Sequence, residues 1–95
     1  MNEPTKTVLV RIEGRVQGVW YRGWTVSQAQ ALGLTGWVRN RYDRSVEALI
    51  SGPKEDVNGL LDLLWQGPPA ANVTLVTSET TEAPEGAGFH QRPTV

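Results

Sequence analysis

An arginine and an asparagine, each close to a glycine-containing turn, are the residues of this sequence best suited to phosphate chemistry. Arg22 follows the loop Gly14-Arg-Val-Gln-Gly18, at an expected junction between a strand and a helix. Glycine lets a loop point several backbone N–H groups into one hollow, and the start of a helix adds unpaired N–H groups. A planar guanidinium beside such a cradle can pair with two phosphoryl oxygens. The spacing therefore indicates an anion site, although an ordinary loop with a solvent-facing arginine fits equally well.

Asn40 is unusual for its position, because asparagine is a poor strand former and Asn40 lies in an expected strand. By alternation it shares a face with Val38 and Tyr42, while Arg39 and Arg41 point the other way. A partly buried amide needs hydrogen-bond partners for both of its ends. Asn40 is therefore either a hairpin residue that bonds the local backbone or part of a functional site, where residues often break local rules.

Other common catalytic groups are scarce in this chain. It has no cysteine, which excludes a disulfide, a thiolate nucleophile and a zinc–cysteine site. The one histidine, His90, has no neighbouring ligand pattern and is expected at the surface. Asp43 and Glu47 are expected to be solvated hairpin charges and not a catalytic carboxylate pair. We therefore expect no metal and no cofactor, and a chemistry that relies on positioning and charge neutralisation.

Charge is divided unevenly along the chain. Residues 1–44 hold seven Lys and Arg against three acidic residues, a balance of +4, while residues 45–95 hold two against seven, a balance of −5. A cationic half can attract a small anion, although two solvated faces of opposite sign would give the same pattern. The net charge of −1 argues against a general nucleic-acid binder. No apolar run is long enough to span a membrane and no signal segment opens the chain, so we expect a cytoplasmic protein. We also expect it to be a monomer.

Apolar residues alternate in four segments and recur at helical spacing in two more. The expected strands cover residues 7–13, 36–42, 46–50 and 73–80, and the expected helical stripes run over residues 21–32 and 57–64. Asp43-Arg44 is the expected tip of a hairpin, and Gly67-Pro68-Pro69 ends the second helix. Asn58-Gly59 is a hairpin signal, but the helical period on both sides favours a helix there. A short fifth strand is expected over residues 89–94, at an edge because of Pro93.

This element order, β-α-β-β-α-β, predicts a ferredoxin-like α+β sandwich in one domain, residues 1–95. Right-handed crossovers place both helices on one face of an antiparallel sheet. The first and second strands then run parallel with the third between them. The loop after the first strand and the end of the second strand therefore meet at one edge of the sheet, which brings Arg22 towards Asn40.

Two long motifs resemble the signatures of the acylphosphatase family. They are Gly14-Arg-Val-Gln-Gly-Val-Trp-Tyr-Arg22 and Leu32-Gly-Leu-Thr-Gly-Trp-Val-Arg-Asn40, and their separation matches that of the family. The Gly67-Pro68-Pro69 break and the closing residues 89–95 are similar as well, so the resemblance covers nearly the whole chain. It implies an enzyme that hydrolyses acyl phosphates to a carboxylate and inorganic phosphate, which as the product should compete with the substrate.

The resemblance also implies roles for individual residues. Arg22 would bind the phosphoryl group, and Asn40 would orient the attacking water. Backbone N–H groups would form a phosphate cradle over five further residues, Gln17, Gly18, Val19, Trp20 and Tyr21. The sequence departs from the family pattern at Arg44, where glycine is usual, and at Gln91, where the last strand usually has an aliphatic residue. We expect both departures to affect stability and neither to touch the site.

Two other functions fit the same fold. One is a non-catalytic ferredoxin-like module that binds phosphate or another small anion, since a fold does not determine a function. An RNA-binding version would need basic and aromatic residues on the third strand, and residues 45–50 contain neither. The other is a domain detached from a larger carbamoyl-transferring enzyme, which is disfavoured because nothing follows Val95. Hydrolysis of a model acyl phosphate would separate the three.

Overall fold

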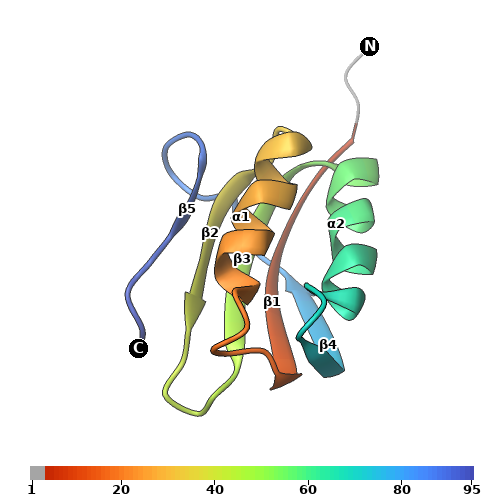
Figure 1. Cartoon of the computed structure of the whole chain (residues 1–95). Coiled ribbons are helices and arrows are strands. Elements are labelled where there is room, and N and C mark those ends of the chain that lie inside the picture. The colour runs from red at the N-terminus through yellow and green to blue at the C-terminus, as the bar shows by residue number, and fades with distance from the viewer. Residues whose placement is uncertain (1–3) are drawn as a thin grey trace.

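Two helices pack on one face of a five-stranded sheet (Figure 1) in the computed structural model, which describes residues 4–95. The strand order is β4-β1-β3-β2-β5. The elements in chain order are β1 (Thr5–Arg15), α1 (Tyr21–Ala31), β2 (Thr35–Asn40), β3 (Val46–Pro53), α2 (Lys54–Gln66), β4 (Asn72–Thr80) and β5 (Phe89–Gln91). The ferredoxin-like arrangement that the sequence predicts is confirmed.

The sheet is mixed and not purely antiparallel. Strand β3 pairs antiparallel with β1 and β2, and β4 pairs antiparallel with β1. Strand β5, however, lies parallel to β2, with Gly36 opposite Phe89 and Val38 opposite Gln91. The chain leaves β4 at one edge of the sheet and reaches the other edge before it forms β5. A tight turn would make consecutive strands antiparallel, but a long crossover also allows a parallel strand. The expectation of an antiparallel sheet was therefore wrong for this edge alone.

Two element boundaries show which local signals prevail. Strand β2 ends at Asn40 and not at Tyr42, because Arg41 begins the turn: its N–H donates to Ser45 O (2.9 Å), and the Arg44 N–H donates to Arg41 O (3.0 Å). Strand β5 ends at Gln91, short of the expected residue 94. Helix α2 continues through Asn58-Gly59, as expected from its flanking period, because Val57, Leu60 and Leu64 of its apolar stripe are buried.

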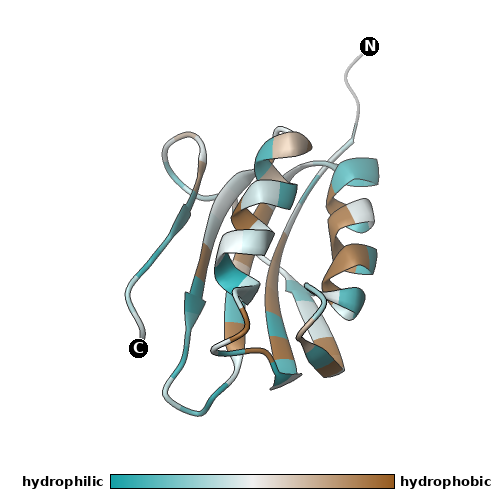
Figure 2. Cartoon of the chain, viewed as in Figure 1, coloured by the Kyte–Doolittle hydropathy of each residue, from teal (hydrophilic) through white to brown (hydrophobic). Residues whose placement is uncertain are grey.

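The core lies between the helices and the facing side of the sheet. Alternate residues of the central strands point into it, and residues at helical spacing point down from the helices. Figure 2 shows this division, with apolar segments turned towards the interior and hydrophilic colour along the β2–β3 hairpin and the C-terminal segment. The fully buried members include Val8, Val10 and Ile12 of β1, Val46, Ala48 and Ile50 of β3, and Val57, Leu60 and Leu64 of α2.

The other face of the sheet carries paired charges. Glu47 accepts hydrogen bonds from Arg39 Nε (2.7 Å) and Arg41 Nη1 (3.2 Å), and its side chain is only 15% exposed. Glu47 is therefore not the solvated hairpin charge that the sequence suggests. Asp43 forms an ion pair with Arg11. Three of the basic residues that give residues 1–44 their positive balance thus form ion pairs with carboxylates.

In the described part of the chain, no helix combines the length and the apolar character needed to cross a membrane.

Candidate active site

The loop between β1 and α1 is held in the fold by its apolar residues. Val16 and Val19 are buried, 1% and 9% exposed, so the loop cannot move freely away from the core. Between and after them, Gly18 (φ 75°) and Trp20 (φ 64°) adopt the left-handed conformation. Left-handed residues set within a tight turn allow successive backbone N–H groups to converge on one concavity. This backbone conformation is compatible with the anion cradle expected from the sequence.

The first turn of α1 lacks the groups that usually satisfy a helix start. Trp20 occupies the N-cap position and makes no side-chain cap hydrogen bond, and the first turn contains no acidic residue. The first N–H groups of a helix have no intrahelical partners, and they lie at the positive end of the helix dipole. This helix start is therefore open to an anion from outside the helix.

A cavity of about 110 Å³ lies between this loop, the start of α1 and the ends of β2 and β5. It brings Arg22 and Asn40 together at one site. The other residues that line it are Val16, Gln17, Gly18, Trp20, Tyr21, Gly23 and Gln91. Every residue expected in the site is present except Val19, whose side chain is buried in the core.

Gln17 connects the cradle loop to the hairpin that follows Asn40. Its side-chain Nε2 donates to Arg41 O (2.8 Å) and to Ser45 O (2.9 Å), at the base of the β2–β3 hairpin. These two bonds use the side-chain amide for structure, which leaves the backbone of Gln17 as the part that can serve the cradle. They also fix the loop relative to Asn40, the residue immediately before Arg41.

Asn40 is the last residue of β2, and its side-chain oxygen has no hydrogen-bond partner. Oδ1 of Asn40 is buried and accepts no bond from any residue in the range 4–95. A buried acceptor without a partner costs about 1–3 kcal/mol, and such atoms in native proteins often mark functional sites. The local backbone bonds that would make Asn40 an ordinary hairpin residue are not formed by this oxygen.

The guanidinium of Arg22 has a different environment from those on the open face of the sheet. Arg11, Arg39 and Arg41 are each paired with a carboxylate, whereas Arg22 forms no ion pair within residues 4–95. A guanidinium in a cavity with no carboxylate among the lining residues has its N–H donors available for an anion.

Tyr21 contributes to the site by holding it in place. Its hydroxyl donates to Leu64 O (2.5 Å), which joins the start of α1 to the last turn of α2. Burial raises the pKa of this hydroxyl well above its ordinary value. Tyr21 therefore stays neutral in the physiological range, and its side chain is a structural link and not a proton donor or acceptor.

Gln91 lines the cavity, so the expectation that it would not touch the site was wrong. Strand β5 places Gln91 opposite Val38, on the neighbouring strand to Asn40, and alternation puts it on the same face as the buried Phe89. The alternation of Phe89 and Gln91 can be predicted from the sequence, so their shared face is expected. The pairing of β5 with β2 cannot be predicted from the local sequence, and that pairing brings Gln91 to the cavity.

Arg44, the other departure, lines a larger hollow that adjoins the cavity. Its φ of 78° is left-handed, the conformation that a glycine would adopt without strain. A residue other than glycine is strained in this conformation, so the departure from glycine at Arg44 bears on the stability of the turn.

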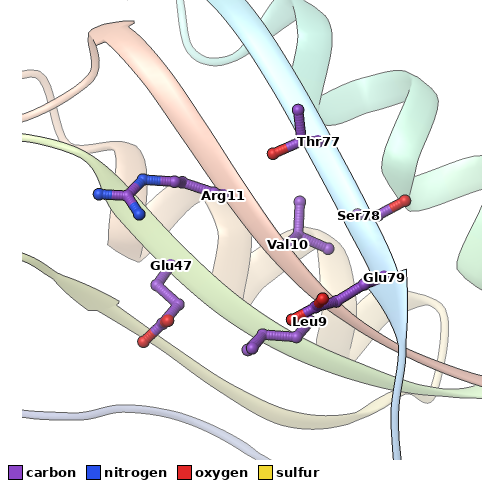
Figure 3. Close-up of a pocket in the computed structure, with 7 residues that line it drawn as sticks. All are labelled: Leu9, Val10, Arg11, Glu47, Thr77, Ser78 and Glu79. Carbon is purple, nitrogen blue, oxygen red and sulfur yellow. The ribbon is translucent and has the colours of Figure 1, made fainter.

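A further hollow of about 270 Å³ lies on the open face of the sheet, over β1, β3 and β4 (Figure 3). Two carboxylates, Glu47 and Glu79, line it together with Arg11. Its floor is a sheet whose backbone N–H groups are engaged in strand pairing. It therefore offers an anion little, despite being larger than the cavity at Arg22.

Metal-ligating groups do not gather anywhere in residues 4–95: no three His, Cys, Asp or Glu side chains lie close enough to hold an ion. His90 is exposed, as expected, and its Nε2 lies 3.0 Å from Ala87 O.

Comparison with known proteins gives a consistent result. The family model described as acylphosphatase matches residues 8–91. A curated acylphosphatase of Rhodospirillum rubrum is 53% identical over 90 residues, which cover 95% of this chain and 99% of that protein. Among solved structures, an acylphosphatase from Coxiella burnetii superimposes with a TM-score of 0.89 at 34% identity and covers 93% of each chain. The acylphosphatase from Bacillus subtilis gives a TM-score of 0.86 at 30% identity, with 94% of this chain and 99% of that chain covered.

Proposed function

The chain belongs to the acylphosphatase family and is an enzyme that hydrolyses acyl phosphates, and from this premise we propose that Arg22 and Asn40 carry the reaction. Family membership favours the hydrolase over a non-catalytic anion-binding module. The observation that supports the proposed residues is the 110 Å³ cavity, where an unpaired guanidinium, an uncapped helix start and an unpartnered amide oxygen meet.

The phosphoryl group of the substrate occupies the cradle. Its oxygens accept hydrogen bonds from the backbone N–H groups of residues 17–21 and from the planar fork of Arg22. These donors neutralise the charge that spreads over the phosphoryl oxygens in the transition state. An acyl phosphate is already activated, because its leaving group is a stabilised carboxylate. Positioning and charge neutralisation therefore supply most of what the reaction needs.

Asn40 holds the attacking water. The amide can accept one hydrogen bond and donate another, which fixes both the place and the orientation of a water molecule. The water oxygen forms a bond to phosphorus while the bond from phosphorus to the acyl oxygen breaks, which gives inorganic phosphate and a carboxylate. No carboxylate or imidazole lines the cavity, so an oxygen of the substrate accepts the water proton.

The substitution Asn40→Ala tests this role. We expect kcat to fall by about 10²-fold with KM and phosphate affinity nearly unchanged, the pattern of an interaction made in the transition state. The Asn40 Oδ1 makes no hydrogen bond in residues 4–95, so the substitution removes none at this atom. We therefore expect no decrease of the thermal midpoint from that cause. Asn40→Asp should also be poor, since a carboxylate beside the phosphoryl group adds like-charge repulsion.

Hydrolysis of benzoyl phosphate, with kcat, KM and the thermal midpoint measured on one preparation, distinguishes the two roles of Asn40. If Asn40 served only the hairpin, Asn40→Ala would lower stability by about 1 kcal/mol and leave kcat intact. A normal kcat in a folded Asn40→Ala protein would therefore remove Asn40 from the mechanism.

A further inference from the structure

A hollow of about 390 Å³ adjoins the candidate cavity and differs from it in charge. The two spaces share Val16 and Gln17 as lining residues, so a ligand in the cradle is next to the hollow. Three arginines line the hollow, Arg15, Arg41 and Arg44, and no acidic residue does. We call this space the arginine hollow.

Two of the three arginines have no carboxylate partner in the part of the chain that the structure describes. Arg41 shares Glu47 with Arg39, at 3.2 Å and 2.7 Å, so part of its charge is neutralised on the open face of the sheet. Arg15 and Arg44 are exposed and form no ion pair within the described residues. Asp43, the acid nearest to Arg44 in the sequence, pairs with Arg11 and accepts hydrogen bonds from Ser45 N (3.0 Å) and Oγ (2.6 Å). Glu13, the acid nearest to Arg15, does not line the hollow. The arginine hollow therefore has a positive balance.

The backbone and the side chain of Arg44 have different roles in the fold. With φ at 78°, this residue adopts a conformation that a side chain with a β-carbon rarely takes. Its N–H donates to Arg41 O (3.0 Å) in the hairpin turn, whereas its guanidinium forms no hydrogen bond and no ion pair with residues 4–95. The turn therefore uses the backbone of Arg44 and leaves its guanidinium available to a ligand.

We propose that the arginine hollow binds a second anionic group on the acyl part of the substrate, so that the enzyme prefers acyl phosphates of acids that carry a further negative charge. The inference rests on the proposed function, because it requires the phosphoryl group to occupy the cradle. Arg44 and Arg15 are then specificity-determining residues. They attract the distal charge and take no part in cleavage of the bond to phosphorus.

A rigid pair of substrates isolates this effect. Benzoyl phosphate and 4-carboxybenzoyl phosphate differ by one distal carboxylate, and any electronic effect of that group on reactivity is the same in every variant. The measured quantity is the ratio of kcat/KM for the charged substrate to that for the neutral one. In the natural protein we expect the ratio to exceed that of Arg44→Gly by about tenfold at low salt, and the difference to shrink as ionic strength rises.

Arg44→Gly is a favourable variant because glycine accepts the left-handed conformation without strain. Its thermal midpoint should equal or exceed that of the natural protein, so a lower ratio cannot result from unfolding. Arg15→Gln should lower the ratio as well. Arg92→Gln is the matched control, since Arg92 lies over the Trp37 ring at 5.0 Å and does not line the hollow, and its ratio should not change.

An unchanged ratio in both Arg44→Gly and Arg15→Gln, with normal hydrolysis of benzoyl phosphate, would overturn the inference and leave the phosphoryl site intact. If folded Arg44→Gly no longer hydrolysed either substrate, the inference would also be overturned, because Arg44 would then belong to the phosphoryl site. Failure of the proposed function has a different result: folded Asn40→Ala would keep its full kcat on benzoyl phosphate.

Discussion

The two junctions where a strand passes into a helix differ more than the fold requires. Strand β3 passes directly into α2 at Pro53, and the first turn of α2 contains Glu55 and Asp56. Strand β1 is joined to α1 by a loop with left-handed Gly18 and Trp20, and the first turn of α1 contains no acid. Both helices face the same side of the sheet (Figure 1), so the topology alone does not distinguish them.

The difference supports the proposal that only one of two similar helix starts is an anion site. Every helix begins with unpaired N–H groups and a positive dipole end. In α2, acidic side chains within the helix offset that dipole. In α1, no acidic side chain of the first turn offsets the dipole, and Arg22 adds a full positive charge. A hollow of about 310 Å³ near the start of α2, lined by Lys54 and Glu55, is larger than the cavity at Arg22. The proposal for the smaller cavity therefore rests on Arg22 and the uncapped helix start, and not on size.

The largest expected effect comes from removing the guanidinium that the α1 junction adds. Arg22→Ala should lower kcat/KM for benzoyl phosphate by about 10²–10³-fold, or roughly 2.7–4 kcal/mol, because a donor to the transition-state charge is lost. Lys54→Ala, at the first residue of α2, is the matched control and should keep its activity within about twofold. Near-normal kinetics in folded Arg22→Ala would show that the α1 junction contributes no more to hydrolysis than the α2 junction does.

Inorganic phosphate should bind at the α1 junction and stabilise the protein. Phosphate at about 100 times its dissociation constant adds roughly 2.7 kcal/mol to the free energy of unfolding, and it should compete with the substrate. Arg22→Ala should lose most of this shift at the same concentration, while Lys54→Ala should retain it. Equal shifts in both variants, measured by thermal unfolding, would show that phosphate binds elsewhere.

A smaller effect is expected where the two helices are linked. Tyr21→Phe removes the hydroxyl that donates to Leu64 O and should destabilise the fold by about 1 kcal/mol, with kcat nearly unchanged. Burial raises the pKa of Tyr21 above 10, so the neutral form is favoured in the folded state. Its contribution is complete below pH 10 and is lost as the pH rises further. Unfolding at several alkaline pH values should therefore show a steeper loss in the natural protein than in Tyr21→Phe.

The smallest effect should come from neutralising the start of α2. Glu55→Gln with Asp56→Asn removes the charges that offset the helix dipole, at a cost of about 0.3–1 kcal/mol for each at low salt. Hydrolysis and the phosphate-induced shift in thermal midpoint should not change. A fall in kcat in this variant would mean that the second junction also contributes to the reaction.

Local patterns were sufficient for most of the architecture and failed at particular residues. Alternation located the core positions of β1 and β3, and the helical stripe of α2 outweighed the Asn58-Gly59 signal because its apolar residues become buried. The same alternation could not show that Glu47 is enclosed by Arg39 and Arg41. Charge pairing across strands depends on register, which a single segment does not contain.

The sequence by itself determined the order of the elements, the glycine-containing loop before Arg22 and the placement of Asn40 near the end of a strand. These features depend on residues that are near one another in the chain, through side-chain period and backbone preference. Only the tertiary structure decided that β5 runs parallel to β2, that Gln91 reaches the cavity and that Gln17 ties the loop to the hairpin. Each of these joins segments far apart in the chain, and a local pattern does not specify its distant partner.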